Sequence, residues 1–309
     1  MVTVLINHSL TTESINPNTN NIDSLSTEGI LTIMNQEDAK ITTAIQDVLK
    51  EIENAVDLVF NAIKNGGHIF FVGAGTSGRL GVLEAAECPP TFGVSPELFQ
   101  GIIAGGDNAV FKSVESAEDQ EIQGMIDLEK RNVSDRDIVI GIAASGRTPY
   151  VIGALKWAKK NKVKTISVSC NRDSIIGGIA DQKIEPVVGP EVISGSTRMK
   201  AGTATKMILN MITTAAMIKM GKVYKNLMVD LNVSNLKLRE RAVHILENTT
   251  EVSEEKAREF LDAANYDVKT AIVMIKKGLD YKKAKSLLDH VNGYVRLAID
   301  HENEVDESF

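Results

Sequence analysis

Cysteine and long apolar runs are both scarce in this sequence. Only Cys88 and Cys170 occur among 309 residues, too few for the disulfide framework of a small secreted domain, and such sparse thiols are typical of a reducing compartment. The longest apolar stretch, 207–220, is interrupted by Asn210 and Lys219, so it is too short and too polar to span a bilayer. The chain does not open with a basic segment and an apolar core, so we expect no signal peptide. These absences predict a soluble, cytoplasmic protein with no membrane partner.

Charge and motif content exclude further classes of protein. Lys and Arg number 34 against 41 Asp and Glu, a net charge of −7, which argues against nucleic acid as the main partner. The five histidines share no ligand spacing and no C-x-x-C pair occurs, so we expect no metal site. A Walker motif is also missing, which argues against a nucleoside triphosphate. The composition, 43% apolar and 24% charged, is that of a globular chain with about two domains.

A repeated order of short apolar strand, Gly/Ser-rich loop and helix predicts the architecture. The expected strands are 68–73, 98–104, 137–143, 163–170 and 183–188, and the expected helices are 41–63, a helix ending near Glu87, 117–131, 149–160 and 200–220. Near-continuous apolar strands that alternate with helices indicate an α/β fold with a doubly wound parallel sheet. Four later helices, 236–248, 253–264, 268–276 and 281–289, predict a small C-terminal all-helical domain. We therefore divide the chain into an N-terminal arm (1–35), an α/β domain (36–235) and a C-terminal helical domain (236–309).

Two of the predicted loops share a Ser-Gly-Arg core and each begins a helix. In a parallel sheet such loops lie at the carboxyl ends of strands, where ligands bind, and the free N–H groups of a helix start favour a phosphate. A third polar segment, 194–203, precedes the long helix. We predict phosphate binding by residues of all three segments, although ordinary turns and helix caps would use the same residue types: Thr76, Ser77, Gly78, Arg79, Ser145, Gly146, Arg147, Thr148, Ser196 and Lys200.

The first loop also fits the dinucleotide pattern G-x-G-x-x-G, from Gly73 to Gly78. That pattern needs an acidic residue about 20 positions later, at the end of the next strand. The next expected strand ends instead at Gly105-Gly106-Asp107, about 30 positions away. We therefore expect no nicotinamide cofactor, and no other cofactor.

Two glutamates lie near these loops. Glu87 precedes Cys88-Pro89-Pro90, and because prolines disfavour helix continuation we expect its helix to end there. Glu118 lies at the expected start of another helix, with Ser116 as a possible N-cap. On the sequence alone, each glutamate is more often a solvated surface residue than a catalytic one.

Long segments of the chain resemble one known family. The segments 73–93 (GAGTSGRLGVLEAAECPPTFG), 141–155, 193–206 and 222–238 are similar to those of the N-acetylmuramic acid 6-phosphate etherases, which have the sugar isomerase (SIS) fold. The resemblance implies a three-layer SIS sandwich and a homodimeric lyase of amino-sugar catabolism and peptidoglycan recycling. Such a lyase cleaves the D-lactyl ether of N-acetylmuramate 6-phosphate with water, giving N-acetylglucosamine 6-phosphate and D-lactate. The chain departs from the family at Ser116, where Gly is expected.

The resemblance also implies roles for the two glutamates. Glu87 matches the proton donor of the family and Glu118 matches its second active-site glutamate. A helix carboxyl end disfavours negative charge and an amino end favours it, so our hypothesis is that Glu87 is the acid and Glu118 the base. Two alternatives of the same fold remain open: a non-catalytic sugar-phosphate sensor and an aldose–ketose phosphosugar isomerase.

Overall fold

The computed structural model describes residues 10–231, 233 and 235–301. The chain divides into two compact units, which we call the sheet unit (Met1–Glu87 and Ser95–Ala215) and the helical unit (Cys88–Val94 and Ala216–Phe309). Within the described residues no helix is long and apolar enough to cross a membrane. The functional division predicted at residues 35 and 235 stays a prediction, because compactness alone does not assign function.

The sheet unit contains five parallel strands in the order β2-β1-β3-β4-β5. Their bounds are Ile69–Gly73 (β1), Phe99–Ile103 (β2), Ile138–Ile142 (β3), Lys164–Val168 (β4) and Gln182–Ile184 (β5). The order reverses direction between β1 and β3, which pair with each other. This confirms the predicted doubly wound sheet. The loops that follow β1 and β3 therefore lie side by side at the carboxyl ends of these two strands.

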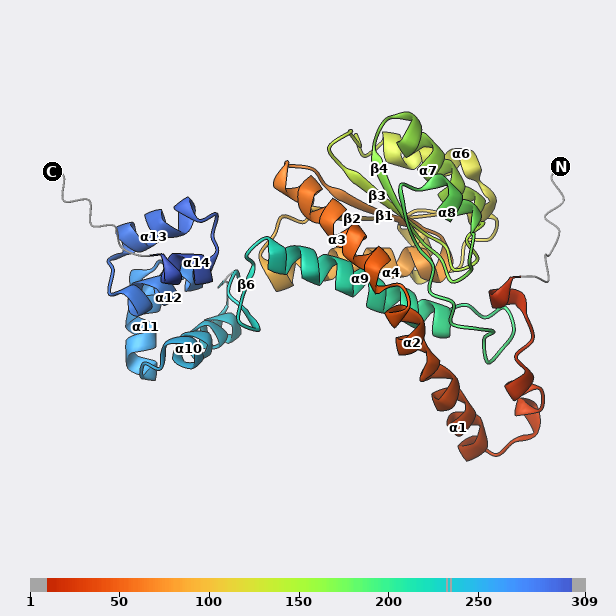
Figure 1. The fold of residues 1–309 in the computed structure, drawn as a ribbon, viewed down its shortest axis with the longest axis horizontal. Coiled ribbons are helices and arrows are strands. Elements are labelled where there is room, and N and C mark those ends of the chain that lie inside the picture. The colour runs from red at the N-terminus through yellow and green to blue at the C-terminus, as the bar shows by residue number, and fades with distance from the viewer. Residues whose placement is uncertain (1–9, 232, 234, 302–309) are drawn as a thin grey trace. The chain divides into compact units, whose positions relative to one another are not determined.

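Helices cover both faces of the sheet (Figure 1). On one face α6 (Glu121–Glu129) and α7 (Pro149–Lys160) pack with Phe70, Val72 and Val139 in a buried cluster. On the other face α3 (Leu49–Lys64) contacts β1 and β3, and α4 (Gly75–Phe92) approaches Phe71 so closely that a Cβ on Gly81 would lie 2.7 Å from the Phe71 Cβ. The three layers follow from strands whose residues are buried on both sides.

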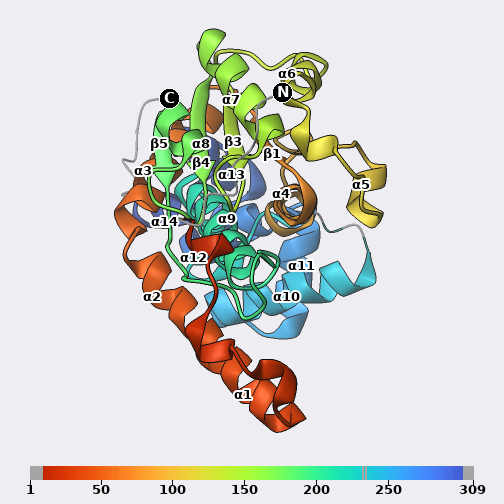
Figure 2. The same cartoon turned by 90° about the vertical axis from the view of Figure 1, so that its right-hand side faces the viewer.

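The N-terminal part of the chain is more regular than the sequence indicated. Three short 3-10 turns, Thr11–Glu13 (η1), Pro17–Thr19 (η2) and Ile22–Ser24 (η3), precede α1 (Thr27–Asp38) and α2 (Lys40–Gln46). Figure 2 shows α1 and α2 following one another at the lower end of the view. The expected single helix 41–63 is therefore two helices, α2 and α3, separated at Val48, which has a φ of −118°.

Helix α4 corrects the expectation that the prolines end a helix at Glu87. The helix continues through Pro89 and Pro90 to Phe92. Proline removes one backbone donor but can still adopt a helical φ, and the burial of Cys88 and Phe92 favours the continued helix. Glu87 thus lies inside a helix and not at its carboxyl end.

Short helices connect the remaining strands of the sheet unit to the elements that follow them. Helix α5 (Asn108–Phe111) and the 3-10 turn η4 (Ala117–Asp119) follow β2, and α8 (Ile175–Ile179) follows β4. The predicted helix 117–131 is thus divided into η4 and α6. Helix α9 (Lys200–Lys219) begins in the sheet unit and agrees with the prediction to one residue.

The helical unit begins with a two-stranded antiparallel hairpin, β6 (Val223–Tyr224) and β7 (Leu227–Met228), that the sequence did not indicate. It continues as α10 (Leu236–Thr250), α11 (Glu254–Ala263), α12 (Val268–Lys277), α13 (Tyr281–His290) and α14 (Val295–Asp300). The hydroxyl of Ser253 caps α11 as predicted, accepting a hydrogen bond from Lys256 N at 3.5 Å. The apolar faces of these helices bury one shared core, which confirms a helical C-terminal region.

Candidate functional site

The strand-end edge of the sheet unit contains a polar pocket of about 380 Å³. The loops after β1 and β3 form its floor, the 3-10 turn η4 forms one wall, and residues distant in sequence complete it. Its lining consists of Glu13, Ala74, Gly75, Thr76, Ser77, Glu118, Asp119, Ala143, Ala144, Ser145, Arg147, Thr148, Pro149, Gly195 and Thr197. We call it the strand-end pocket.

A second cavity of about 310 Å³ shares Ala74, Gly75 and Glu118 with the strand-end pocket. The rest of its lining comes from Arg79, Ala104, Ala109 and the segment 113–118. The two cavities therefore meet at the Glu118 side of the first loop. Together they give a polar site on one edge of the sheet unit.

The first Ser-Gly-Arg loop brings Thr76 and Ser77 into the pocket through the first turn of α4. The N–H groups of a first helical turn have no partner inside the helix, so they and the two hydroxyls can donate to an anion. Arg79 has a different role: its Nε donates to Val110 O at 2.9 Å and braces the loop beside α5. Gly78 serves packing, because a Cβ there would lie 2.6 Å from Ile103 Cγ1.

The second loop presents Ser145, Arg147 and Thr148 to the same pocket at the start of α7. Gly146 has a φ of +71°, and a Cβ at this position would lie 2.3 Å from the Cβ of Ser174, so only glycine fits without strain. The two loops meet as predicted, with hydroxyl donors and two helix starts around one space. Such a site favours a phosphate group.

The third segment contributes differently from the prediction. Gly195 and Thr197 line the pocket, whereas the predicted Ser196 and Lys200 do not. Lys200 is fully buried, and its Nζ donates to Glu37 Oε2 at 2.6 Å. Burial alone would raise the pKa of Glu37, but hydrogen bonds from Lys200, Lys40 and Asn18 outweigh it and lower that pKa to about 2.

The start of α9 is occupied by a carboxylate of the chain itself. Glu191 is fully buried, and its two oxygens accept hydrogen bonds from Lys200 N and Ala201 N, each at 3.0 Å. These N–H groups are the ones a bound phosphate would use. Of the three helix starts proposed from the sequence, those of α4 and α7 therefore face the pocket and that of α9 is filled.

The two predicted catalytic glutamates differ in their relation to the two cavities. Glu118 lines both cavities from η4. Glu87 is exposed, lines neither cavity, and lies twelve residues after Gly75 on α4, which is about 18 Å along a helix axis. Glu87 also lacks the helix-end position on which the acid–base hypothesis relied.

Sequence reasoning did not identify two other acidic residues of the sheet unit. Glu13 reaches the strand-end pocket from η1, but nothing local in a Thr- and Asn-rich segment marks it. Glu84 is buried between α4 and α9, where it accepts hydrogen bonds from Asn210 Nδ2 and Thr213 Oγ1, each at 2.5 Å. Burial raises the pKa of Glu84 despite these donors.

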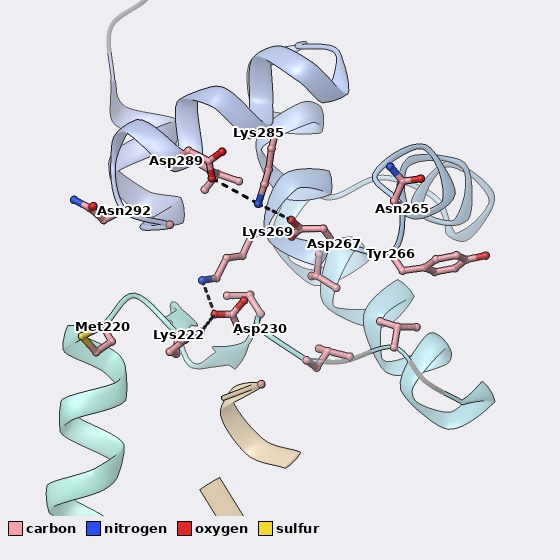
Figure 3. Close-up of a pocket in the computed structure, with 17 residues that line it drawn as sticks. Met220, Lys222, Asp230, Asn265, Tyr266, Asp267, Lys269, Lys285, Asp289 and Asn292 are labelled. Carbon is pink, nitrogen blue, oxygen red and sulfur yellow. Dashed lines mark hydrogen bonds and ion pairs between the residues drawn. The ribbon is translucent and has the colours of Figure 1, made fainter. Parts of the chain in front are cut away.

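The helical unit has a cavity of its own, about 860 Å³ in volume (Figure 3). Its charged side chains are already paired: Lys222 and Lys269 each lie 2.7 Å from Asp230 Oδ2, and Lys285 lies between Asp267 and Asp289. The charges balance, so this cavity offers no unmatched cation to a phosphate. The strand-end pocket is the better candidate site. Within the described part of the chain, no cluster of His, Cys, Asp and Glu could hold a metal ion.

Comparisons with known proteins identify the relatives of this chain and the domains that it matches. The SIS domain family matches residues 113–215, the glucokinase regulatory protein N-terminal SIS domain matches 51–159, and the C-terminal lid domain of glucokinase regulatory protein matches 225–276. The N-acetylmuramic acid 6-phosphate etherase of Clostridium acetobutylicum is 56% identical over 94% of this chain and 96% of its own. That of Bacillus subtilis is 53% identical over 95% of this chain and 97% of its own. Among solved structures, a phosphoheptose isomerase from Francisella tularensis superimposes on 62% of this chain and 98% of its own at 18% identity, with a TM-score of 0.49.

Proposed function

Because this chain belongs to the N-acetylmuramic acid 6-phosphate etherase family, we propose that its strand-end pocket binds the phosphosugar that this family cleaves. The protein is a carbon–oxygen lyase. With water it converts N-acetylmuramate 6-phosphate to N-acetylglucosamine 6-phosphate and D-lactate. The observation that carries the assignment to this pocket is the convergence of two helix starts, their hydroxyls and Glu118 on one space.

The phosphate group of the substrate binds at the two Ser-Gly-Arg loops. Thr76, Ser77, Ser145 and Thr148 supply hydroxyl donors, and α4 and α7 supply free N–H groups. Arg147 adds a positive charge to the same lining. This arrangement supports a phosphosugar ligand in an otherwise acidic protein.

The reaction proceeds by elimination followed by hydration. An alkyl ether is a poor electrophile, but opening the sugar ring exposes an aldehyde at C1 that acidifies the proton on C2. A base removes this proton while an acid protonates the ether oxygen on C3, the C3–O bond breaks, and lactate leaves. Water then adds to the unsaturated aldehyde. Each proton transfer is worth about 10²–10⁴-fold in rate.

Glu118 is the residue we assign as the base, because it lies in the pocket at the meeting point of both cavities. It lies on η4 beside Asp119 and opposite the hydroxyl-rich loops. Its carboxylate is exposed in the single chain, so it is free to reach a bound sugar.

Glu87 acts as the acid only if a second copy of the chain brings it to the site. Its face of α4 carries Leu83, which is 47% exposed, and the neighbouring helix α9 carries Met211, which is 36% exposed. We propose that the chain forms a homodimer, as its family resemblance implies, and that Glu87 of the partner subunit completes the site around Glu118.

Two further assignments complete the proposal. The C-terminal helices, which bury a core of their own, support the homodimer. The protein acts in the cytoplasm, where a reducing environment suits Cys88 and Cys170, two buried cysteines that form no disulfide. Burial raises the pKa of the Cys170 thiol to about 12, so this cysteine is no nucleophile.

The decisive experiment is to incubate the purified protein with N-acetylmuramate 6-phosphate and to measure D-lactate. We expect lactate release from the phosphorylated sugar and far less from N-acetylmuramate. An isomerase would retain the ether and release no lactate, and a sensor would bind without turnover. Equal rates with and without the phosphate would contradict the phosphate assignment.

A further inference from the structure

The segment that contains Glu13 is held firmly against the strand-end loops. Thr12 is buried, its N donates to Asn171 Oδ1 at 3.4 Å, and Asn171 Nδ2 donates to Thr12 Oγ1 at 3.0 Å. The same Asn171 Nδ2 donates to Ala144 O at 3.0 Å. A single amide therefore connects the residue before Glu13 to the loop that carries Ser145.

The residues after Glu13 are anchored to the segment that precedes α9. Asn16 Nδ2 donates to Pro190 O at 3.2 Å, and Thr19 Oγ1 donates to Val192 O at 3.0 Å. Both side chains are buried. Ser194 Oγ also donates to the carbonyl of Glu13 itself, at 3.4 Å. Contacts on both sides of Glu13 thus fix its position.

The Glu13 side chain lies in the lining of the strand-end pocket, together with Thr76, Ser77 and Ser145. Its Oε2 would lie 3.6 Å from a Cβ on Gly195, across the pocket rim. Within the described residues no Lys, Arg or His forms an ion pair with this carboxylate. It is therefore an acceptor that the protein leaves available to a ligand.

The charge of Glu13 restricts which ligand group it can contact. A carboxylate repels a phosphate dianion and the carboxylate of a lactyl group, and it attracts O–H and N–H donors. The hydroxyls and helix starts across the pocket are hydrogen-bond donors, so they attract the anionic groups that a carboxylate repels. The pocket is thus polarised, with donors at the Ser-Gly-Arg loops and carboxylates at Glu13, Glu118 and Asp119.

From this polarity we propose that Glu13 is a specificity-determining residue that accepts a hydrogen bond from a neutral O–H or N–H group of the sugar. It orients the phosphosugar with its phosphate toward Ser77 and Ser145 and its C1–C2 end toward the acidic side. This inference rests on the proposed function and adds to it a residue from the N-terminal segment. The segment is then part of the site and not merely an arm.

Binding of two probes, N-acetylglucosamine 6-phosphate and inorganic phosphate, tests the proposal by calorimetry on the full chain. In Glu13→Ala we expect the affinity for the sugar phosphate to fall by about 10- to 100-fold, as for loss of a charged hydrogen bond. The affinity for inorganic phosphate should stay the same or increase, because a negative charge has been removed. Glu28→Ala is the matched control, since Glu28 is exposed on α1 and distant from the pocket lining.

The remaining outcomes separate this inference from the proposed function. Equal losses of affinity for both probes would overturn the inference, because they would indicate that Glu13 only supports the loops. Unchanged binding of both probes by Glu13→Ala would overturn it as well. Glu13→Asp, which keeps the acceptor, should recover part of the lost affinity and so exclude a mere folding defect. If the wild-type protein bound neither probe and released no lactate, the proposed function itself would fail.

Discussion

Lys200 Nζ lies 2.6 Å from Glu37 Oε2, and both side chains are almost completely buried. This ion pair joins the start of α9 to the end of α1, and it replaces the substrate contact that the sequence suggested for Lys200. Removing Lys200 would leave the buried carboxylate of Glu37 with Lys40 and Asn18 as its remaining partners. Through this ion pair Lys200 stabilises the folded sheet unit.

Lys200→Met should destabilise the protein by about 1.5–3 kcal/mol, because it removes one charge-assisted hydrogen bond from the buried carboxylate of Glu37, which keeps Lys40 and Asn18 as partners. Lys206→Met changes an exposed lysine of the same helix and should cost less than about 0.5 kcal/mol. Urea denaturation of both variants measures the difference. If Lys200→Met kept wild-type stability but raised the KM for the phosphosugar, the original phosphate-binding role would be restored.

Glu84→Gln should change the pH dependence of stability. Burial raises the pKa of Glu84, so the folded protein holds this proton more tightly than the unfolded chain, and the stability due to Glu84 decreases as pH rises above about 4.5. The variant lacks this titration and should therefore gain stability relative to wild type as pH rises above about 4.5, until Glu84 of the wild-type protein is ionised in the folded state as well. Denaturation curves across this range test the sign. Glu97→Gln, which alters an exposed carboxylate, should show no such trend.

Ser116→Gly should stabilise the loop that precedes Glu118. Ser116 has a φ of +60°, a left-handed conformation that costs a non-glycine residue about 1 kcal/mol or more. Part of the gain is offset by the greater freedom of glycine in the unfolded chain, so we expect at most about 1 kcal/mol. Ser113→Gly, at a position without positive φ, should be neutral or destabilising. Equal effects of the two changes would show that backbone strain at Ser116 is unimportant.

The two glutamates should differ in an exchange experiment. Glu118→Gln cannot accept the C2 proton, so it should abolish both lactate release and exchange of that proton with solvent deuterium. Glu87→Gln should lose lactate release by about 10²-fold or more while some exchange persists, provided that deprotonation precedes C–O cleavage. Mass spectrometry of the recovered sugar measures the exchange. Exchange that survives only in Glu118→Gln would reverse the two roles.

Mixing the two inactive variants tests whether each site uses both copies. If Glu118 acts with Glu87 of the partner subunit, a mixed dimer of Glu87→Gln and Glu118→Gln contains one intact site. Random reassembly should then recover about a quarter of the wild-type activity. If instead each site took both glutamates from one chain, every site in the mixture would lack one glutamate, and no activity would be recovered. Mixing wild-type protein with either variant measures how completely the subunits exchange between dimers.

The sequence predicted the sheet well because its strands carry a strong local signal. The runs around Phe70, Val139 and Ile166 are continuous and apolar, and β1 to β4 lie within the expected ranges. The two Ser-Gly-Arg loops were recognisable for the same reason, since residues adjacent in sequence form them. Helix α1 was missed because it has few apolar residues, although Ser26, which caps it by accepting a hydrogen bond from Gly29 N, was a readable start signal.

Long-range contacts explain what the sequence did not indicate. Nothing near Lys200 in sequence indicates Glu37, and nothing near Glu13 indicates Asn171. Pro89 and Pro90 indicated that the helix ends near Glu87. The helix instead continues to Phe92, because this buries Cys88 and Phe92. Contacts between residues far apart in the sequence determine these features, and a single sequence does not show which distant residues will meet.

The hydrogen bonds between Thr12 and Asn171 span 159 residues, and this separation has a consequence for biosynthesis. Glu13 leaves the ribosome early, but Asn171, Pro190, Val192 and Ser194 are made much later. Thr12, Asn16 and Thr19 therefore cannot complete these contacts until Val192 has been translated. Closing so long a loop is slow, and the strand-end pocket also needs Gly195 and Thr197. The ligand pocket is thus one of the last parts of the sheet unit to be completed as the nascent chain folds.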